Sequence, residues 1–252
     1  MKKNISLLFL LTLFVSVYPL SEQAQLKGFV DLATVDQTIR VSLRYSTDHN
    51  FVGVPINGYN KSIVLLTNQA AQALHNVQEE VKKDGYSLVV YDAYRPQQAV
   101  DHFITWSQDI AKQIKKNQYY PRVDKKDVFK LGYVARRSGH SRGSTVDVTL
   151  IKLDNQLQSI KLQERVLLDG FKITYLDDGT LDMGSSFDLF DQVSHCENNL
   201  IQESYKKNRT YLKTVMTKHG FKNYACEWWH FTLHDEPYPA DHESSYFNFV
   251  IE

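Results

Sequence analysis

The sequence predicts an α+β domain in which a small, mostly antiparallel sheet is flanked by helices. Three observations lead to this prediction. With 252 residues, of which 42% are apolar, the chain is long enough to bury one substantial core. Segments with the helical spacing of apolar residues alternate with short segments rich in β-branched and aromatic residues. No internal repeat or low-complexity linker divides the sequence into several units.

Three segments have the apolar spacing of amphipathic helices. The first ends before Gly85, and its apolar positions are Ala71, Leu74, Val77 and Val81. The second follows Pro96, which can open a helix at its first position. Its apolar positions are Val100, Phe103, Ile104 and Ile110. The third runs from about Arg209 to His219, where Gly220 stops it.

The strands of the sheet are expected near Val41, Val89, Val146 and Trp229. Residues 145–150 alternate polar and apolar side chains, which is the period of a half-buried strand. Asp147 shares one face with Thr145 and Thr149, so it would point from a rigid strand into a polar cleft. The alternative is an edge strand on which Asp147 is merely solvated.

The first 25 residues are expected to be a secretory signal peptide. Lys2 and Lys3 give a basic start, and residues 5–20 are almost wholly apolar. This apolar run is shorter than the ~20 residues that a membrane-spanning helix needs, which argues against a retained anchor. Residues 26–252 would then form the mature domain.

Charge and cysteine content limit the possible classes of protein and of crosslink. Lys and Arg together number 29, as do Asp and Glu, so the sequence lacks the basic surplus typical of nucleic-acid-binding proteins. The two cysteines, Cys196 and Cys226, could form a disulfide in an exported protein. Two separate buried thiols are an equally good interpretation.

Two motifs far apart in the sequence together supply the ligands of a metal site. Residues 138–147 contain His140 and Asp147, seven positions apart across a Ser/Gly turn, and residues 227–230 contain Glu227 and His230, three positions apart. Two imidazoles and one carboxylate, with a fourth position open, are a ligand set of catalytic zinc sites, in which the pKa of bound water falls to about 7. Glu227 remains free to act as a base. Either motif alone is weak evidence, but together they predict a hydrolytic zinc centre.

The backbone around Glu227 is expected to be irregular. The aromatic composition of residues 224–233 favours a strand over a helix. A regular strand would place Glu227 and His230 on opposite faces, because they are an odd number of residues apart. Either a bulge lies between them or Glu227 sits where the strand begins, and we expect a strand with an irregular entry.

Residues 138–150, the run 227–230 and the following segment 235–239 closely resemble the D-alanyl-D-alanine dipeptidases, the vancomycin-resistance-type branch of the zinc D,D-peptidases. The family pattern SxHxxGxAxD fits, except that Thr145 stands where alanine is usual and adds a hydroxyl on the site face. The similarity covers about residues 27–252, with a longer connection between Asp147 and Asp188 than in the shorter members. It implies the family's α+β fold, which is shared with Hedgehog-type zinc domains.

The resemblance also implies the roles of individual residues. His140, Asp147 and His230 correspond to the ligands of one Zn²⁺ per chain, and Glu227 corresponds to the general base and acid. Arg95 corresponds to an essential arginine that steadies the transition state. Its expected position at a strand-to-helix corner suits a fixed cation that reaches a developing oxyanion. On spacing alone, a local cap or ion pair is as good an interpretation of this arginine.

Three further positions correspond to substrate contacts in the family. Tyr45 and Asp188 match residues that hold the free ammonium of the substrate, and Ser138 matches a third contact. A buried carboxylate makes a charge-assisted hydrogen bond with a cation, and it would restrict the enzyme to short substrates with a free N-terminus. Residues 175–180 are typical of a hairpin or a loop, which we expect over the rim of the site.

The resemblance implies hydrolysis of D-alanyl-D-alanine, or of a similar D,D-dipeptide, in the bacterial periplasm or outside the cell. Export fits the destruction of a cytoplasmic precursor less well, so it favours cell-wall turnover or salvage. One alternative is a D,D- or L,D-carboxypeptidase that acts on longer peptidoglycan peptides, and the pair Tyr45 and Asp188 speaks against it. Another is a non-catalytic peptidoglycan-binding module, for which Glu227 and Arg95 would be unnecessary. The sequence leaves the choice between resistance, turnover and salvage open.

Overall fold

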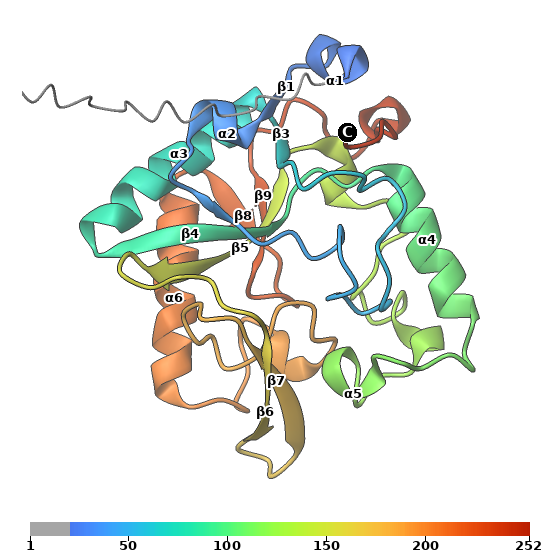
Figure 1. Cartoon of the computed structure of the whole chain (residues 1–252), viewed down its shortest axis with the longest axis vertical. Helices are drawn as coiled ribbons and strands as arrows, with labels where there is room; N and C mark the ends of the chain where they lie inside the picture. Colours follow the sequence, from blue (N-terminus) through green and yellow to red (C-terminus); the bar gives the residue numbers. More distant parts are fainter. Residues whose placement is uncertain (1–20) are drawn as a thin grey trace, which may run out of the picture.

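A five-stranded sheet lies at the centre of the computed structural model, which describes residues 21–252 (Figure 1). Residues 1–20 of the expected signal peptide lie outside this range. The strand order in the sheet is β2 (Arg40–Val41), β4 (Tyr86–Asp92), β5 (Thr145–Lys152), β9 (His230–Leu233) and β8 (Phe221–Asn223). Only the β2–β4 pair is parallel, so the prediction of a mostly antiparallel sheet is confirmed.

Two smaller sheets lie beside the central one. Strands β1 (Phe29–Asp31) and β3 (Leu65–Thr67) form an antiparallel pair. Strands β6 (Lys161–Val166) and β7 (Lys172–Asp177) form a hairpin that extends away from the central sheet (Figure 1). The expected hairpin at residues 175–180 is therefore the end of β7 and the turn that follows it.

Three long helices surround the central sheet: α3 (Asn68–Lys83), α4 (Gln97–Gln108) and α6 (Glu203–Lys218). Figure 1 shows α3 and α6 on one side of the molecule and α4 on the other. The shorter helices are α1 (Glu22–Leu26), α2 (Leu32–Val35), α5 (Lys116–Tyr119), η1 (Lys125–Asp127), η2 (Gly139–Arg142), η3 (Gln192–Ser194) and η4 (Glu243–Ser245). All three predicted helices are present. The sequence predicts the middle of each helix more accurately than the residues at which it begins and ends.

Two helix boundaries differ from the prediction. Helix α4 ends at Gln108, and Ile110 is 61% exposed beyond it, so its assignment to the apolar side was wrong. Lys125 Nζ donates to the carbonyl oxygens of Trp106 (3.1 Å) and Asp109 (2.9 Å), which holds the chain in a different path after the helix. Helix α6 begins at Glu203, earlier than predicted, because its first turns are polar and carry no apolar pattern.

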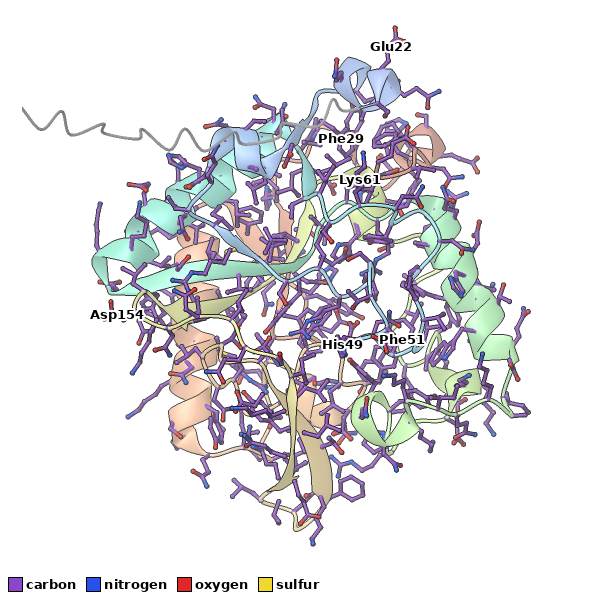
Figure 2. All side chains as sticks on the ribbon, viewed as in Figure 1. Glu22, Phe29, His49, Phe51, Lys61 and Asp154 are labelled. Carbon is purple, nitrogen blue, oxygen red and sulfur yellow. The ribbon has the colours of Figure 1, made fainter. Side chains whose placement is uncertain are left out.

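The core surrounds the two longest strands of the central sheet. Helix α3 packs against β4, and helix α6 packs against β8 and α3. On β5, the apolar residues and also Thr145, Asp147 and Thr149 are buried, so this strand is covered on both faces rather than half-buried. Asp147 therefore projects into an enclosed space, whereas Glu22 and Asp154 mark the periphery of the molecule (Figure 2). Among residues 21–252, the helices are too short or too polar to cross a bilayer.

Candidate active site

Three separate elements bring the predicted metal ligands together. Asp147 on β5 lies directly opposite His230 at the start of β9. Residues opposite each other on antiparallel strands project on the same face, so these two side chains meet. His140 belongs to η2, the short helix just before β5. The three ligands thus come from two neighbouring strands and a turn.

Gly143 gives the turn its shape. Its φ of +81° is in the left-handed region, and an added Cβ would lie 2.2 Å from the ring of Phe29. Only glycine fits there without displacing the ring. At the other end of η2, the side chain of Ser138 accepts a hydrogen bond from the His140 backbone N–H (3.3 Å). The turn therefore folds His140 back beside Asp147, as the sequence predicts.

The three ligand atoms are spaced as a zinc ion requires. His140 Nε2 is 3.3 Å from His230 Nδ1 and 3.3 Å from Asp147 Oδ1, and His230 Nδ1 is 3.2 Å from Asp147 Oδ1. Tetrahedral ligands at about 2.0–2.1 Å from zinc lie about 3.3–3.4 Å from one another. Asp147 Oδ1 is buried and has no hydrogen-bond donor within the described part of the chain. The set fits Zn²⁺.

The protonation states of the ligands also suit a metal. His140 Nδ1 lies 2.7 Å from the carbonyl oxygen of Ala93, which can only accept, so Nδ1 carries the hydrogen and the Nε2 lone pair faces the other ligands. Burial lowers the pKa of His230, which favours neutral imidazole. Burial alone would raise the pKa of Asp147, but the contacts with His140 and His230 hold it well below its usual range.

One other group of potential ligands occurs in the described residues, formed by Asp36, His75 and Glu79. His75 Nδ1 and Asp36 Oδ2 are 2.7 Å apart, which is hydrogen-bond distance and too short for two ligands of one tetrahedral zinc. Glu79 pairs with Lys82 at 2.8 Å. We therefore interpret this group as local contacts, in which the buried Asp36 pairs with His75 and the exposed Glu79 pairs with Lys82.

Glu227 lies in the turn that precedes β9, so the entry to the strand is irregular as expected, but the strand itself begins only at His230. Its Oε2 is 3.4 Å from His230 Nδ1, yet the carboxylate is not part of the compact ligand group. Asn223 holds the turn from behind, because its Nδ2 donates to the carbonyl oxygens of Glu227 (3.1 Å) and His230 (2.9 Å). Burial, followed by the charge of Asp147, raises the pKa of Glu227 well above its usual range. Such a carboxylate accepts a proton readily.

Arg95 is held rigidly between β4 and α4, where Pro96 forms the N-cap instead of the expected first helical position. Its Nε and Nη2 lie 3.0 Å and 2.9 Å from Asp92 Oδ2, and Nη2 is 3.7 Å from Asp147 Oδ2. The guanidinium also lies over the ring of Tyr45, at 5.0 Å from its centroid. The local ion pair therefore exists, and it fixes a cation beside the ligands.

Tyr45 and Asp188 form a second polar group. The Tyr45 hydroxyl donates to Asp188 Oδ2 at 2.7 Å. Asp188 has a φ of +59°, a conformation that residues other than glycine rarely adopt and that is concentrated at functional sites. Burial, followed by the charge of Asp147, raises the pKa of Asp188 to about 8. A cation placed beside this carboxylate would therefore stabilise its charged form.

All eight predicted site residues line one cavity of about 220 Å³. They are Tyr45, Arg95, Ser138, His140, Asp147, Asp188, Glu227 and His230. The volume is below the range of about 300–1,000 Å³ typical of pockets for drug-sized ligands, so the cavity suits a small molecule.

The sequence did not reveal the other walls of the cavity, which are Phe51, Phe103, Tyr224, Gly139 and residues 132–135. The hydroxyl of Tyr224 donates to the carbonyl oxygen of Gly132 at 3.1 Å and thereby links two of these walls. Residues 175–180 do not line this cavity, so their expected place at the rim was wrong. The hydroxyl of Thr145 hydrogen bonds with Thr232 (2.8 Å) and also lies outside the lining.

Sequence comparisons identify the family of this chain. The D-Ala-D-Ala dipeptidase family matches residues 25–161 and 171–250. A D-alanyl-D-alanine dipeptidase of Enterococcus faecium is 35% identical over 89% of this chain and 98% of its own length. One from Streptomyces coelicolor is 38% identical over 88% of this chain and 98% of its own. A solved zinc(II) complex of a vancomycin resistance D,D-pentapeptidase is 11% identical, with a TM-score of 0.37 over 73% of this chain and 80% of that chain.

The family match spans most of the chain, and the similarity to the two dipeptidases extends over nearly their whole length. The internal stretch between the two matched ranges, residues 162–170, belongs to the β6–β7 hairpin and does not line the cavity. The chain therefore belongs to the D-alanyl-D-alanine dipeptidase family of zinc metallopeptidases.

Proposed function

We propose that this protein is an exported zinc dipeptidase that hydrolyses D-alanyl-D-alanine, or a closely similar D,D-dipeptide, to free amino acids. The observation that carries the proposal is the arrangement within one small cavity. Three ligand atoms at tetrahedral spacing lie in the same cavity as the carboxylate of Glu227 and the guanidinium of Arg95. The cavity also contains the carboxylate of Asp188, whose charged form a cation would stabilise. Each group corresponds to one requirement of dipeptide hydrolysis.

His140, Asp147 and His230 would hold the zinc ion. When bound, zinc supplies a Lewis acid at the wall of the cavity. Glu227 would accept a proton from the attacking water and deliver it to the leaving amine, which is the usual task of a general base and acid. The carboxylate is suited to both steps because it lies next to the ligands without joining them.

Arg95 would stabilise the negative charge that develops on the scissile carbonyl oxygen. The contacts with Asp92 and the ring of Tyr45 fix the guanidinium before substrate binds. A preorganised donor of this kind costs no reorganisation during the reaction, and this is the main reason for its effect on rate. Asp92 is itself held by the hydroxyl of Tyr59, which donates to Asp92 Oδ1 at 2.7 Å.

Asp188 and Tyr45 would hold the free ammonium of the substrate, with Ser138 as a third contact. The carboxylate of Asp188 is 5% exposed and lines the same cavity as the ligands. A substrate ammonium would therefore sit within one small enclosure together with the reacting carbonyl. This restriction favours a dipeptidase over a D,D- or L,D-carboxypeptidase on longer peptides, and a non-catalytic binding module would need neither Glu227 nor Arg95.

Export would place the enzyme in the periplasm or outside the cell. This proposal rests on the basic start and the apolar run of residues 5–20, which are typical of a signal peptide. The catalytic domain would then comprise residues 26–252. An exported enzyme would meet dipeptides released from the cell wall rather than cytoplasmic precursors, so we favour turnover or salvage as its role.

Acetylation of the substrate amine is expected to abolish hydrolysis almost completely. N-acetyl-D-Ala-D-Ala lacks the ammonium that would hold Asp188 in its charged form, so the charge-assisted hydrogen bond is lost. We expect kcat/KM to fall on the order of 10²-fold, because a hydrogen bond to a charged group contributes about 1.5–3 kcal/mol. Steady-state kinetics with the free dipeptide, its N-acetyl form and a wall-like tripeptide measures this effect.

The matched variant Asp188→Asn should lose most of the preference for the free amine while its zinc content stays unchanged. Equal rates of the unmutated enzyme on free and acetylated dipeptide would contradict the amine contact. A preference for the tripeptide would instead identify a carboxypeptidase.

A further inference from the structure

Tyr91, on the buried strand β4, contacts both chain segments that supply the proposed ammonium site. One segment follows β2 and carries Arg44 and Tyr45, and the other lies between β7 and η3 and carries Phe187 and Asp188. The hydroxyl of Tyr45 joins the two segments at the cavity, because it donates to Asp188 Oδ2 at 2.7 Å. Tyr91 contacts the residue that precedes each of these two.

Both contacts are made by the ring of Tyr91. It stacks on the ring of Phe187, with centroids 4.8 Å apart and planes inclined by 25°. The guanidinium of Arg44 lies 4.9 Å from the centroid of the Tyr91 ring. The backbone adds a third link, because Arg44 N donates to Tyr91 O at 3.3 Å. One side chain thus supports the neighbours of both Tyr45 and Asp188.

A buried carboxylate fixes Tyr91 and Arg44 to each other. The hydroxyl of Tyr91 donates to Asp178 Oδ2 at 2.7 Å, and Arg44 Nη2 pairs with the same oxygen. Asp178 Oδ1 accepts hydrogen bonds from the backbone N–H (3.1 Å) and the hydroxyl (2.6 Å) of Thr180. Burial, followed by the charge of Asp178, raises the pKa of Tyr91 well above its usual range, so its hydroxyl remains a donor. Neither side chain can move without breaking this network.

The network lies outside the substrate cavity. Arg44, Tyr91 and Asp178 do not line it, and they border a separate space of only about 20 Å³, which has room for about one water molecule. They therefore affect the substrate only through the residues that they hold. Asp188 has a φ of +59°, and a strained conformation of this kind persists only where its surroundings determine it. The stacking of Phe187 on Tyr91 constrains the residue next to it.

We propose that Tyr91, together with Arg44 and Asp178, is a positioning residue that sets the preference of the enzyme for a free substrate amine. It holds Tyr45 and Asp188 at hydrogen-bond distance before the substrate binds. The ammonium then enters a preorganised site, and ordering of this site no longer reduces the affinity. The proposal rests on the proposed function, because it concerns the ammonium contact of that site.

The test compares Tyr91→Leu with the unmutated enzyme on D-Ala-D-Ala and its N-acetyl form. Loss of the ring should raise KM for the free dipeptide about tenfold, the lower end of the effect of removing a residue that orients a site residue. Loss of substrate affinity alone leaves kcat within about twofold. Hydrolysis of the acetylated dipeptide should not change, so the ratio of the two kcat/KM values should fall about tenfold. Zinc content should stay at about one equivalent.

Two further variants and a control make this test specific. Tyr91→Phe keeps the ring but lacks the hydroxyl, so the ratio should fall less, by about threefold, a fraction of the effect of a hydrogen bond to a charged group. In the Asp188→Asn background, Tyr91→Leu should cause no further loss of the ratio, because it acts through Asp188. Tyr211→Phe is the matched control, since the hydroxyl of Tyr211 also donates to an aspartate, Asp84 Oδ2 at 2.6 Å, but the residue does not line the cavity. Its KM and ratio should match those of the unmutated enzyme.

An unchanged ratio in folded Tyr91→Leu would overturn the proposal, as would a further loss of the ratio in the Asp188→Asn background. If Tyr91→Leu does not fold, an unchanged ratio in Tyr91→Phe has the same meaning.

Amide hydrogen exchange tests the support without using catalysis. In Tyr91→Leu, or in Tyr91→Phe if the leucine variant does not fold, residues 183–190 should exchange faster than in the unmutated protein, while residues 145–152 of β5 keep their protection. Unchanged exchange of residues 183–190 would overturn the inference. Faster exchange in a protein that does not hydrolyse D-Ala-D-Ala would instead refute the proposed function and leave the support by Tyr91 intact.

Discussion

Replacing His230 by alanine is expected to remove both the zinc ion and the hydrolytic activity. His230 Nδ1 is one of three ligand atoms that lie 3.2–3.3 Å apart, and alanine leaves only His140 and Asp147. Two protein ligands hold zinc far more weakly than three, so metal content should fall from about one equivalent to nearly none. Atomic absorption of the dialysed protein and a dipeptidase assay measure the two effects.

His234→Ala is the matched control for this variant. His234 follows the same strand, but its side chain is 77% exposed and contacts only its neighbour Asp235 among the described residues. This control should keep its zinc and its rate. A His230→Ala protein with full zinc content and full activity would show that His230 is not a ligand.

Glu227→Gln is expected to separate zinc binding from catalysis. Glutamine has nearly the size of glutamate and leaves all three ligands in place, but it cannot accept a proton from water. Zinc should therefore remain at about one equivalent, while kcat falls by about 10²–10⁴-fold, the usual effect of losing a general base. Steady-state kinetics on metal-quantified protein measures this loss.

The control for this variant is Glu203→Gln, which changes a carboxylate that is 77% exposed at the start of α6. Its rate and metal content should match those of the unmutated protein. If Glu227→Gln instead lost zinc and kept its rate per bound metal, Glu227 would be a ligand and its assignment as a base would be wrong.

The sequence predicts the ligand motifs well because the chemistry of each is local. His140 and Asp147 are joined by one turn whose glycine is required, and Glu227 and His230 are three residues apart. The strand pairing that places Asp147 opposite His230 is not local, but each strand has a clear pattern of its own. Resemblance to a family then supplied the remaining contacts, including Asp188, which no local pattern distinguishes.

Other features could not be predicted because they depend on tertiary contacts. Residues 132–135, which line the cavity, belong to a loop whose sequence has no periodic pattern of apolar residues. Only the folded chain places this loop beside Tyr224. Helix α4 ends before Ile110, and Lys125 donates there to the carbonyl oxygens of Trp106 and Asp109. This contact joins residues that are far apart in the sequence, so no local pattern predicts it. The spacing of three residues between Asp92 and Arg95 is compatible with an ion pair. Only the structure shows that the two side chains form this pair and that it fixes the guanidinium.

The most direct test of zinc-dependent dipeptidase activity is a substrate comparison with purified, zinc-loaded protein. Release of D-alanine from D-Ala-D-Ala should be measured beside L-Ala-L-Ala and a D-Ala-D-Ala-terminated tripeptide, and then repeated after zinc is removed and restored. We predict that the protein hydrolyses D-Ala-D-Ala but neither L-Ala-L-Ala nor the tripeptide. This activity should disappear when zinc is removed and return when zinc is added. Undiminished hydrolysis without the metal, or faster cleavage of the tripeptide than of D-Ala-D-Ala, would contradict the assignment as a zinc-dependent dipeptidase.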